Sequence, residues 1–145
     1  MSAILLIDDD ADDQLIFKEA INEITDKIEC VFANNGFEGL SRLIQLNPGP
    51  SIIFLDLNMP LMNGFECLEQ IRKNDQWRRI PVIIFSTSNN PEDKRKSERL
   101  GASVFLTKTP DFHLLKLKFA EILQAHFPEF EMFNQTAAHV AQTHL

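Results

Sequence analysis

The sequence predicts an α/β protein built on a doubly wound, five-stranded parallel sheet with helices on both faces. Five short apolar runs, rich in β-branched and aromatic residues, alternate along the chain with five helical patterns. The central run, Ser51 to Leu55, is apolar after its first residue, which is typical of a strand that is buried on both faces. With 145 residues, 44% of them hydrophobic, the chain is long enough for one domain with a substantial core.

The first strand is predicted from Ile4 to Ile7, and acidic residues follow it at once. A helix comes next, because apolar residues recur three and four positions apart. A carboxylate can cap the first turn of a helix, and negative charge suits the positive end of its dipole. We therefore expect Asp10 to be the N-cap, and Asp12 and Asp13 to be solvated residues of the helix start. The helical stripe consists of Leu15, Phe17, Ala20, Ile21 and Ile24.

The middle of the chain contains the second and third strands. The second strand is predicted from Glu29 to Ala33, and the helix after it ends at the breaker Asn47-Pro48-Gly49-Pro50. The central strand is predicted from Ser51 to Leu55 and ends on Asp56. A loop and a third helix follow, marked by Pro60, Asn63 and Gly64 and then by Phe65, Leu68 and Ile71.

The last two strands are predicted from Pro81 to Phe85 and from Val104 to Leu106. Between them lies a helix from Glu92 to Leu100 that is polar nearly all round, so burial anchors it weakly. A fifth helix follows Asp111. Five such strands fit the flavodoxin-like order 2-1-3-4-5, in which ligands bind beyond the carboxyl ends of the first and third strands.

Composition limits the class of protein. The net charge of −7 and the pI near 5.0 argue against binding nucleic acid through a basic face. No apolar run approaches the roughly 20 residues of a membrane span, and no basic segment precedes the first apolar run as in a signal peptide. A cytoplasmic location is expected. Cys30 and Cys67 lie in apolar patterns and are expected to be reduced core thiols.

The predicted topology brings chemically active side chains to one edge of the sheet. Asp8 and Asp9 end the first strand, Asp56 ends the third, and Ser86 and Lys108 follow the fourth and fifth. Three carboxylates at one place cannot all stay ionised without a cation. Oxygen ligands without His or Cys favour Mg²⁺ over a transition metal. A carboxylate nucleophile beside such a cation, a hydroxyl and an ammonium indicates a phosphoryl site.

Four segments resemble the receiver domain of bacterial two-component response regulators, in particular the single-domain, chemotaxis-regulator type. They are Ile-Asp-Asp-Asp, Leu-Asp-Leu-Asn-Met-Pro-Leu-Met-Asn-Gly, Ile-Pro-Val-Ile-Ile-Phe-Ser-Thr-Ser and Gly-Ala-Ser-Val-Phe-Leu-Thr-Lys. The resemblance covers Ala3 to Gln124. It implies a receiver domain over residues 1–126 and a tail over residues 127–145 with no output domain. The tail has no clear period, and it is either disordered or docked on the domain or on a partner.

The resemblance implies a role for each residue of the site. Asp56 would accept a phosphoryl group from a histidine kinase or phosphotransfer protein, and Lys108 would pair with Asp56 or with that group. Ser86 would move toward the phosphoryl group while Phe105 swings inward, as a switch. The Mg²⁺ ligands would be Asp9, Asp56 and the backbone carbonyl of Asn58, with Asp8 acting through water.

Three positions depart from the usual family pattern. Lys108 is followed by Thr109 instead of a proline, so a cis bond after Lys108 is not expected, since a non-proline cis bond costs ~3 kcal/mol. The family usually has a small residue directly after the switch hydroxyl, and in this chain that position is Thr87. The switch aromatic, Phe105, has no hydroxyl group, so its signal would be one of repacking.

Output is expected to pass through protein contact, because only a short tail follows the fifth helix. The surface would be the fourth helix, fifth strand and fifth helix, including Lys94, Arg95 and Phe105, and a homodimer is a further expectation. Two alternatives stay open. One is a receiver-like binding module that is never phosphorylated. The other is a haloacid-dehalogenase-like phosphatase, suggested by Asp8-x-Asp10 after a strand.

Overall fold

The computed structural model describes residues 2–127, and the predicted tail lies outside them from residue 128 onward. The described part contains one five-stranded sheet in the order β2-β1-β3-β4-β5, with every neighbouring pair parallel. The flavodoxin-like order 2-1-3-4-5 is confirmed. The strands are β1 (Ser2–Ile7), β2 (Ile28–Ala33), β3 (Ile52–Leu55), β4 (Val82–Ser86) and β5 (Val104–Thr107).

Five helices connect and cover these strands, and their N-caps explain where each begins. The side chain of Asp10 accepts hydrogen bonds from the backbone N–H groups of Asp12 and Asp13, as its predicted role requires. Asn63 and Glu66 form a reciprocal capping box at the start of α3. The helices are α1 (Ala11–Ile24), α2 (Gly36–Gln45), α3 (Gly64–Lys73), α4 (Pro91–Arg99) and α5 (Phe112–His126).

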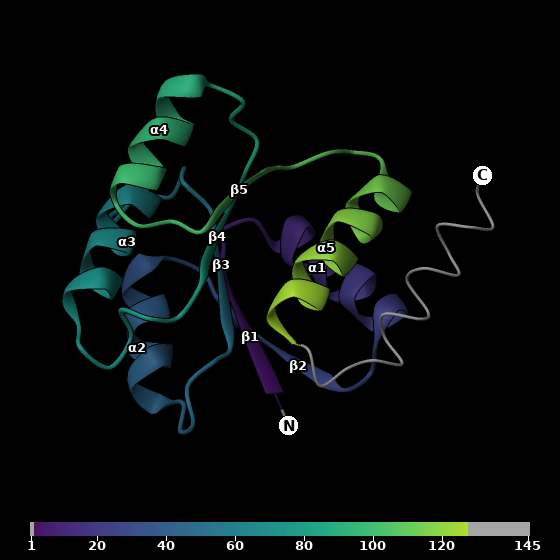
Figure 1. Ribbon diagram of the computed structural model, residues 1–145, viewed down its shortest axis with the longest axis horizontal. Coiled ribbons are helices and arrows are strands. Elements are labelled where there is room, and N and C mark those ends of the chain that lie inside the picture. Colours follow the sequence, from purple (N-terminus) through teal and green to yellow (C-terminus); the bar gives the residue numbers. More distant parts are fainter. Residues whose placement is uncertain (1, 128–145) are drawn as a thin grey trace.

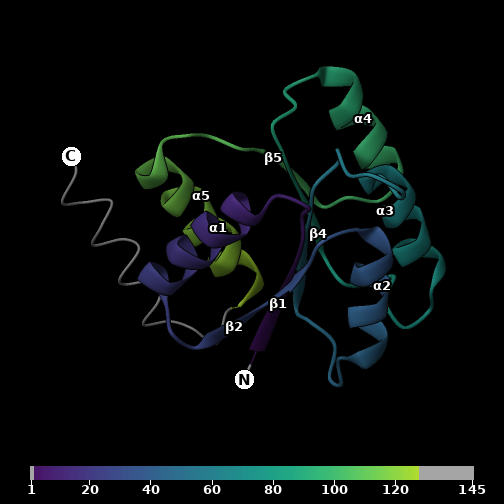
Figure 2. The same cartoon turned by 180° about the vertical axis from the view of Figure 1, so that it is seen from behind.

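The helices form two layers, with α1 and α5 on one face of the sheet and α2, α3 and α4 on the other (Figure 1). The view from behind shows the same two layers (Figure 2). Each face has its own apolar core, because successive residues of a strand point to opposite faces. Within β1, for example, Ile4 and Leu6 face α1 and α5, whereas Leu5 and Ile7 face the other layer.

The boundaries differ from prediction by one or two residues at several ends. β1 begins at Ser2, because its backbone pairs with Ile28 of β2 before the apolar run begins. β3 begins at Ile52, since the backbone of Ser51 bonds to Ala3 but continues no ladder. β5 includes Thr107, which pairs with Ser86. Element ends shift in this way because backbone pairing, and not side-chain polarity, decides them.

Three smaller observations concern the cysteines, the tryptophan and the length of the helices. Cys67 is buried, Cys30 is half-buried, and both are free thiols. Trp77 is partly buried against the core of the α2–α4 layer. Within residues 2–127, no helix is both long enough and apolar enough to cross a bilayer.

Candidate functional site

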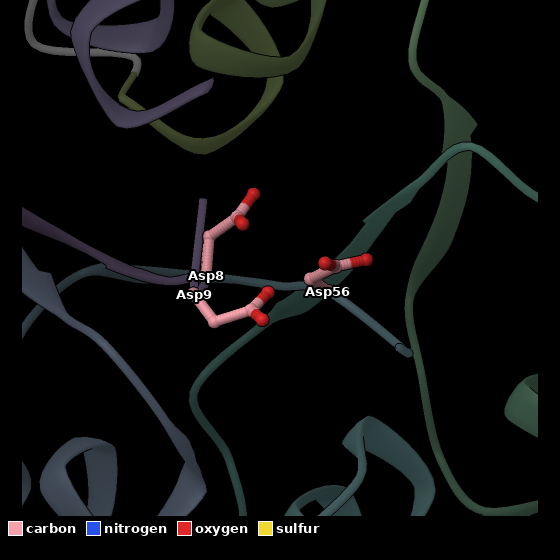
Figure 3. Close-up of side chains that lie close together, drawn as sticks. All are labelled: Asp8, Asp9 and Asp56. Carbon is pink, nitrogen blue, oxygen red and sulfur yellow. The ribbon is translucent and has the colours of Figure 1, made fainter. Parts of the chain in front are cut away.

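Three carboxylates meet where β1 and β3 end. One ligand oxygen each from Asp8, Asp9 and Asp56 lies within 4.8 Å of the other two. Figure 3 shows the three side chains at this edge, with the carboxyl group of Asp9 directed toward Asp56. Asp8 and Asp56 are buried and Asp9 is exposed, so the cluster opens to solvent on one side. The predicted convergence of acids from two strands is confirmed.

Backbone hydrogen bonds fix both buried acids. The N–H of Asp8 donates to the carbonyl of Ala33, and the N–H of Asp56 donates to the carbonyl of Ile7, each at 3.0 Å. One carboxylate oxygen of Asp8 accepts from the N–H of Asp10 at 2.9 Å. The carboxylate of Asp56 accepts from the N–H groups of Leu57 and Asn58 in the turn after the strand. The sheet therefore holds these carboxylates in place before any ligand arrives.

Gly64 allows the loop after β3 to fold back against the strand end. Its N–H donates to the carbonyl of Leu57 at 2.9 Å. A Cβ atom at this position would lie 2.3 Å from the carbonyl oxygen of Asp56, which no side chain can tolerate. The same loop holds Leu61 at φ +70°, a conformation that L-residues rarely adopt. The sequence around Asp56 is thus specialised to bring α3 close to the phosphoacceptor candidate.

Lys108 lies among the acids with its side chain 11% exposed. Its Nζ is 3.6 Å from Oδ2 of Asp56, so the pair expected from the resemblance is present. Two contacts are shorter, however: 2.8 Å to Oδ2 of Asp8 and 2.7 Å to Oδ2 of Asp13. In this state the ammonium group makes its hydrogen bonds to Asp8 and Asp13 and only an ion pair to Asp56.

The expectation for Asp13 was wrong. We expected a solvated residue of the helix start, but its side chain is only 31% exposed and binds Lys108 across 95 positions of sequence. The signal was present in the sequence. Asp13 precedes Phe17 by four residues and so belongs to the buried stripe of α1, where a carboxylate needs a partner.

Burial dominates the protonation behaviour of the two inner acids. Desolvation raises the pKa of Asp8 to about 6, although Lys108 and the N–H of Asp10 oppose the shift. Desolvation also raises the pKa of Asp56, against the charge of Lys108 and the bonds from Asn58 and Leu57. Burial acts to lower the pKa of Lys108, but its bonds to Asp13 and Asp8 and the charge of Asp56 outweigh it and raise that pKa.

The arrangement fits a divalent cation with oxygen ligands. The raised pKa values of Asp8 and Asp56 mean that one ammonium group does not compensate the buried negative charge. Across residues 2–127 this is the one group of three or more acidic, His or Cys side chains that could hold a metal ion. All three donors are carboxylates, which suit hard cations rather than zinc or copper.

The remaining predicted residues surround this cluster. Ser86 is fully buried, and its Oγ accepts a long hydrogen bond of 3.4 Å from the N–H of Ser88. Phe105 is half-buried and packs against the core of the α2–α4 layer. Thr87 is exposed, and so is Asn58, whose backbone follows Asp56 by two residues. Among the described residues the one cis peptide bond is Asn47–Pro48, so the Lys108–Thr109 bond is trans, as its sequence led us to expect.

A family model described as "Response regulator receiver domain" matches residues 4–120. The chain belongs to the response regulator receiver family. The receiver domain is a signalling domain of two-component systems. The match argues against the haloacid-dehalogenase-like alternative, whose motif was only Asp8-x-Asp10.

Known receivers are similar to this chain in sequence and in structure. Response regulator Rcp1 of Synechocystis is 33% identical over 111 residues, which are 73% of this chain and 76% of Rcp1. The crystal structure of the phosphorylated cyanobacterial phytochrome response regulator RcpA superimposes with a TM-score of 0.78 at 30% identity, covering 86% of this chain and 93% of RcpA. The Mn²⁺-bound form of Rcp1 gives a TM-score of 0.76 at 30% identity, covering 90% and 96%.

Proposed function

We propose that this receiver accepts a phosphoryl group on Asp56 from a phosphohistidine of a sensor histidine kinase or a phosphotransfer protein. The observation that carries the proposal is the cluster itself. Oxygens of Asp8, Asp9 and Asp56 lie within 4.8 Å of one another, and Nζ of Lys108 is 3.6 Å from Asp56. The RcpA structure is of the phosphorylated protein and the Rcp1 structure is of the Mn²⁺-bound form, and both support the same chemistry in similar proteins.

In this proposal the chain supplies a held nucleophile and its electrostatic surroundings. A carboxylate oxygen of Asp56 attacks phosphorus, and an oxygen–phosphorus bond forms. The phosphorus–nitrogen bond breaks, and its electron pair returns to the donor imidazole, which binds a proton. Lys108 neutralises charge on the transferred oxygens, and Ser86 donates a hydrogen bond to one of them.

Mg²⁺ is the cation we propose for the site, held by Asp9, Asp56 and the backbone carbonyl of Asn58, with Asp8 acting through water. When bound, it neutralises negative charge on the phosphoryl oxygens. Asp8 and Asp56 then no longer share an uncompensated charge at the buried strand ends.

Incubation with acetyl phosphate and Mg²⁺, followed by intact-mass spectrometry, tests the phosphoacceptor. Wild type should gain one phosphoryl group, and Asp56→Asn should gain none. Hydroxylamine at neutral pH should remove the group, because it cleaves acyl phosphates but not phosphoserine. Asp12→Asn is the matched control, since Asp12 is an exposed acid outside the cluster and should leave the yield unchanged. A wild-type protein that gains no mass, and binds no beryllofluoride with Mg²⁺, would instead be a binding module that is never phosphorylated.

Output is proposed to pass through the surface formed by α4, β5 and α5. Phe105 is half-buried at this surface, and Val104 and Leu114 are 37% and 40% exposed. Ser86 and Phe105 would link the phosphoryl group to this surface, since the two residues lie on neighbouring strands, with Phe105 in register with Ile84 of β4. A downstream protein should bind the beryllofluoride–Mg²⁺ form more tightly than the free form. Sedimentation of both forms tests whether one such partner is a second copy of this chain.

A further inference from the structure

We infer that Asp13 is a positioning residue for Lys108: in the unphosphorylated protein it holds the ammonium group toward α1 and away from Asp56. The inference rests on the proposed function and adds to it a residue that controls when Lys108 reaches the reacting group. It stands on geometry, since Asp13 makes the shortest of the three ion pairs of Lys108.

The position of the Asp13 backbone is fixed independently of Lys108. Its N–H donates to the side chain of Asp10 at 3.1 Å, within the cap that starts α1. Phe17, one turn further on, is fully buried and anchors the same face of the helix in the core. The carboxylate of Asp13 is therefore presented by a rigid element and is not an acid on a mobile loop.

The three acids around Lys108 are not equivalent. Asp8 and Asp56 extend from the sheet, whereas Asp13 belongs to a helix that packs on one side of it. Distances from Nζ are 2.7 Å to Asp13, 2.8 Å to Asp8 and 3.6 Å to Asp56. With two donors of the ammonium occupied, Asp56 receives the weakest contact and its carboxylate stays available to a cation and a phosphoryl donor.

This placement has two consequences that oppose each other. Without Asp13, Lys108 would move closer to Asp56, compete with a divalent cation there and weaken Mg²⁺ binding. Once a phosphoryl group or its mimic is present, Lys108 has to turn toward it, and the Asp13 pair resists that movement. Removing Asp13 should therefore weaken binding of Mg²⁺ but strengthen binding of the phosphoryl mimic once Mg²⁺ is saturating.

The test compares wild type with Asp13→Asn, Asp13→Glu and Asp12→Asn. Asp12→Asn removes the same charge one residue away, from an exposed side chain outside the cluster. Three measurements are made: the NMR resonances of the Lys108 ε-methylene and ammonium, assigned with Lys108→Arg; the Mg²⁺ affinity by calorimetry; and the beryllofluoride affinity at saturating Mg²⁺.

For Asp13→Asn we expect shifted Lys108 resonances, Mg²⁺ affinity lowered about three- to tenfold and beryllofluoride affinity raised by a similar factor, the range of one part-buried ion pair. Asp13→Glu should stay near wild type, and Asp12→Asn should match wild type in all three measurements. A general loss of negative charge would weaken Mg²⁺ binding without strengthening beryllofluoride binding, and that result would overturn the inference. Equal behaviour of Asp13→Asn and Asp12→Asn would overturn it too.

The outcome is separable from that of the proposed function. If wild type takes up neither beryllofluoride nor a phosphoryl group, the proposed function fails, while the Lys108 resonances and the Mg²⁺ affinity still test Asp13. If only the Asp13 comparison fails, the proposal that Asp56 accepts a phosphoryl group is unaffected.

Discussion

The two faces of the sheet are built differently. On the side of α1 and α5, the rings of Phe17, Phe54, Phe85 and Phe119 contact one another with centroid distances from 5.0 to 6.3 Å. On the other side, the structure describes every residue of α4, and Ser97 is the only one of them that is buried. Tight aromatic packing resists local movement, whereas a helix with little buried surface can shift at low cost.

The difference suggests that the two faces of the sheet have different roles. The aromatic face carries α1, and through α1 it holds Asp13 and Lys108 against the acidic cluster. On the other face, which has its own buried core, α4 is the weakly buried element, and it packs beside β5. A rigid face that holds the charges and one weakly buried helix that can respond to them form an arrangement suited to a switch.

The largest effect is expected from Phe119→Ala on the rigid face. Phe119 is fully buried and contacts all three other rings, so its truncation leaves a cavity that the neighbours cannot fill. We expect the free energy of unfolding to fall by about 3–5 kcal/mol, measured by urea denaturation. Leu114→Ala, in the same helix but 40% exposed, should cost less than about 1 kcal/mol. A similar small loss for Phe119→Ala would contradict the rigid half of the comparison.

Arg72→Ala tests how α4 is held at its end. The guanidinium donates to the carbonyls of Gly101 and Ile80 at 2.9 Å each and to that of Arg78 at 3.2 Å. Gly101 follows α4 with φ +101°, so this link depends on a conformation that favours glycine.

Loss of these three bonds should lower stability by about 1–3 kcal/mol. Hydrogen exchange should speed up in α4 far more than in α5, since Arg72 supports only the α4 side of the sheet. Arg78→Ala is the control. Within the described residues, the exposed side chain of Arg78 forms an ion pair only with Asp75, at 3.7 Å. Equal acceleration in both helices would show that α4 is not an independent unit.

The sequence predicts the fold well because the strands are short, largely apolar runs that are followed by polar residues. Ile52–Leu55 followed by Asp56 could be placed from that pattern alone. So could the convergence of Asp8, Asp9 and Asp56, since parallel strands bring their carboxyl ends to one edge.

Side-chain pairing within the site could not be predicted as well. The choice of Lys108 between Asp8, Asp13 and Asp56 depends on differences of less than 1 Å between helix and strand positions. Local rules favoured a solvated Asp13, because acids at a helix start need no other explanation. The position of Asp13 in the stripe of Phe17 was the stronger signal, and tertiary packing decided the outcome.

The charge at the site edge predicts a pH effect that the aromatic face does not share. In the folded protein the pKa values of Asp8 and Asp56 are above their ordinary value of 3.8. At pH values above 3.8 the folded protein therefore binds more protons than the unfolded chain does. The stability of the metal-free protein should therefore fall as pH rises from about 4 through about 6. The raised pKa of Lys108 acts only near and above its ordinary value of 10.5, outside this window.

The substitution Asp56→Asn removes one of the two buried charges that destabilise the metal-free protein at neutral pH. At pH 7.5 with EDTA we expect it to be more stable than wild type by on the order of 1 kcal/mol after allowance for solvent screening. The gain should shrink toward pH 4 and in millimolar Mg²⁺, as urea midpoints will show. Asp12→Asn should lack this dependence, and a destabilised Asp56→Asn at pH 7.5 would mean that Lys108 already compensates the buried charge.

The smallest effect is expected from Arg95→Ala on α4. Arg95 pairs with Glu92 on the same helix, and their side chains are 56% and 69% exposed. Exposed pairs at this spacing contribute little, so the free energy of unfolding should change by less than about 0.5 kcal/mol. Binding of an output partner should change more than stability does, because the same side chain lies on the proposed output surface. A loss of stability above about 1 kcal/mol would mean that surface charge, and not burial, holds α4 in place, and the contrast between the two faces would then disappear.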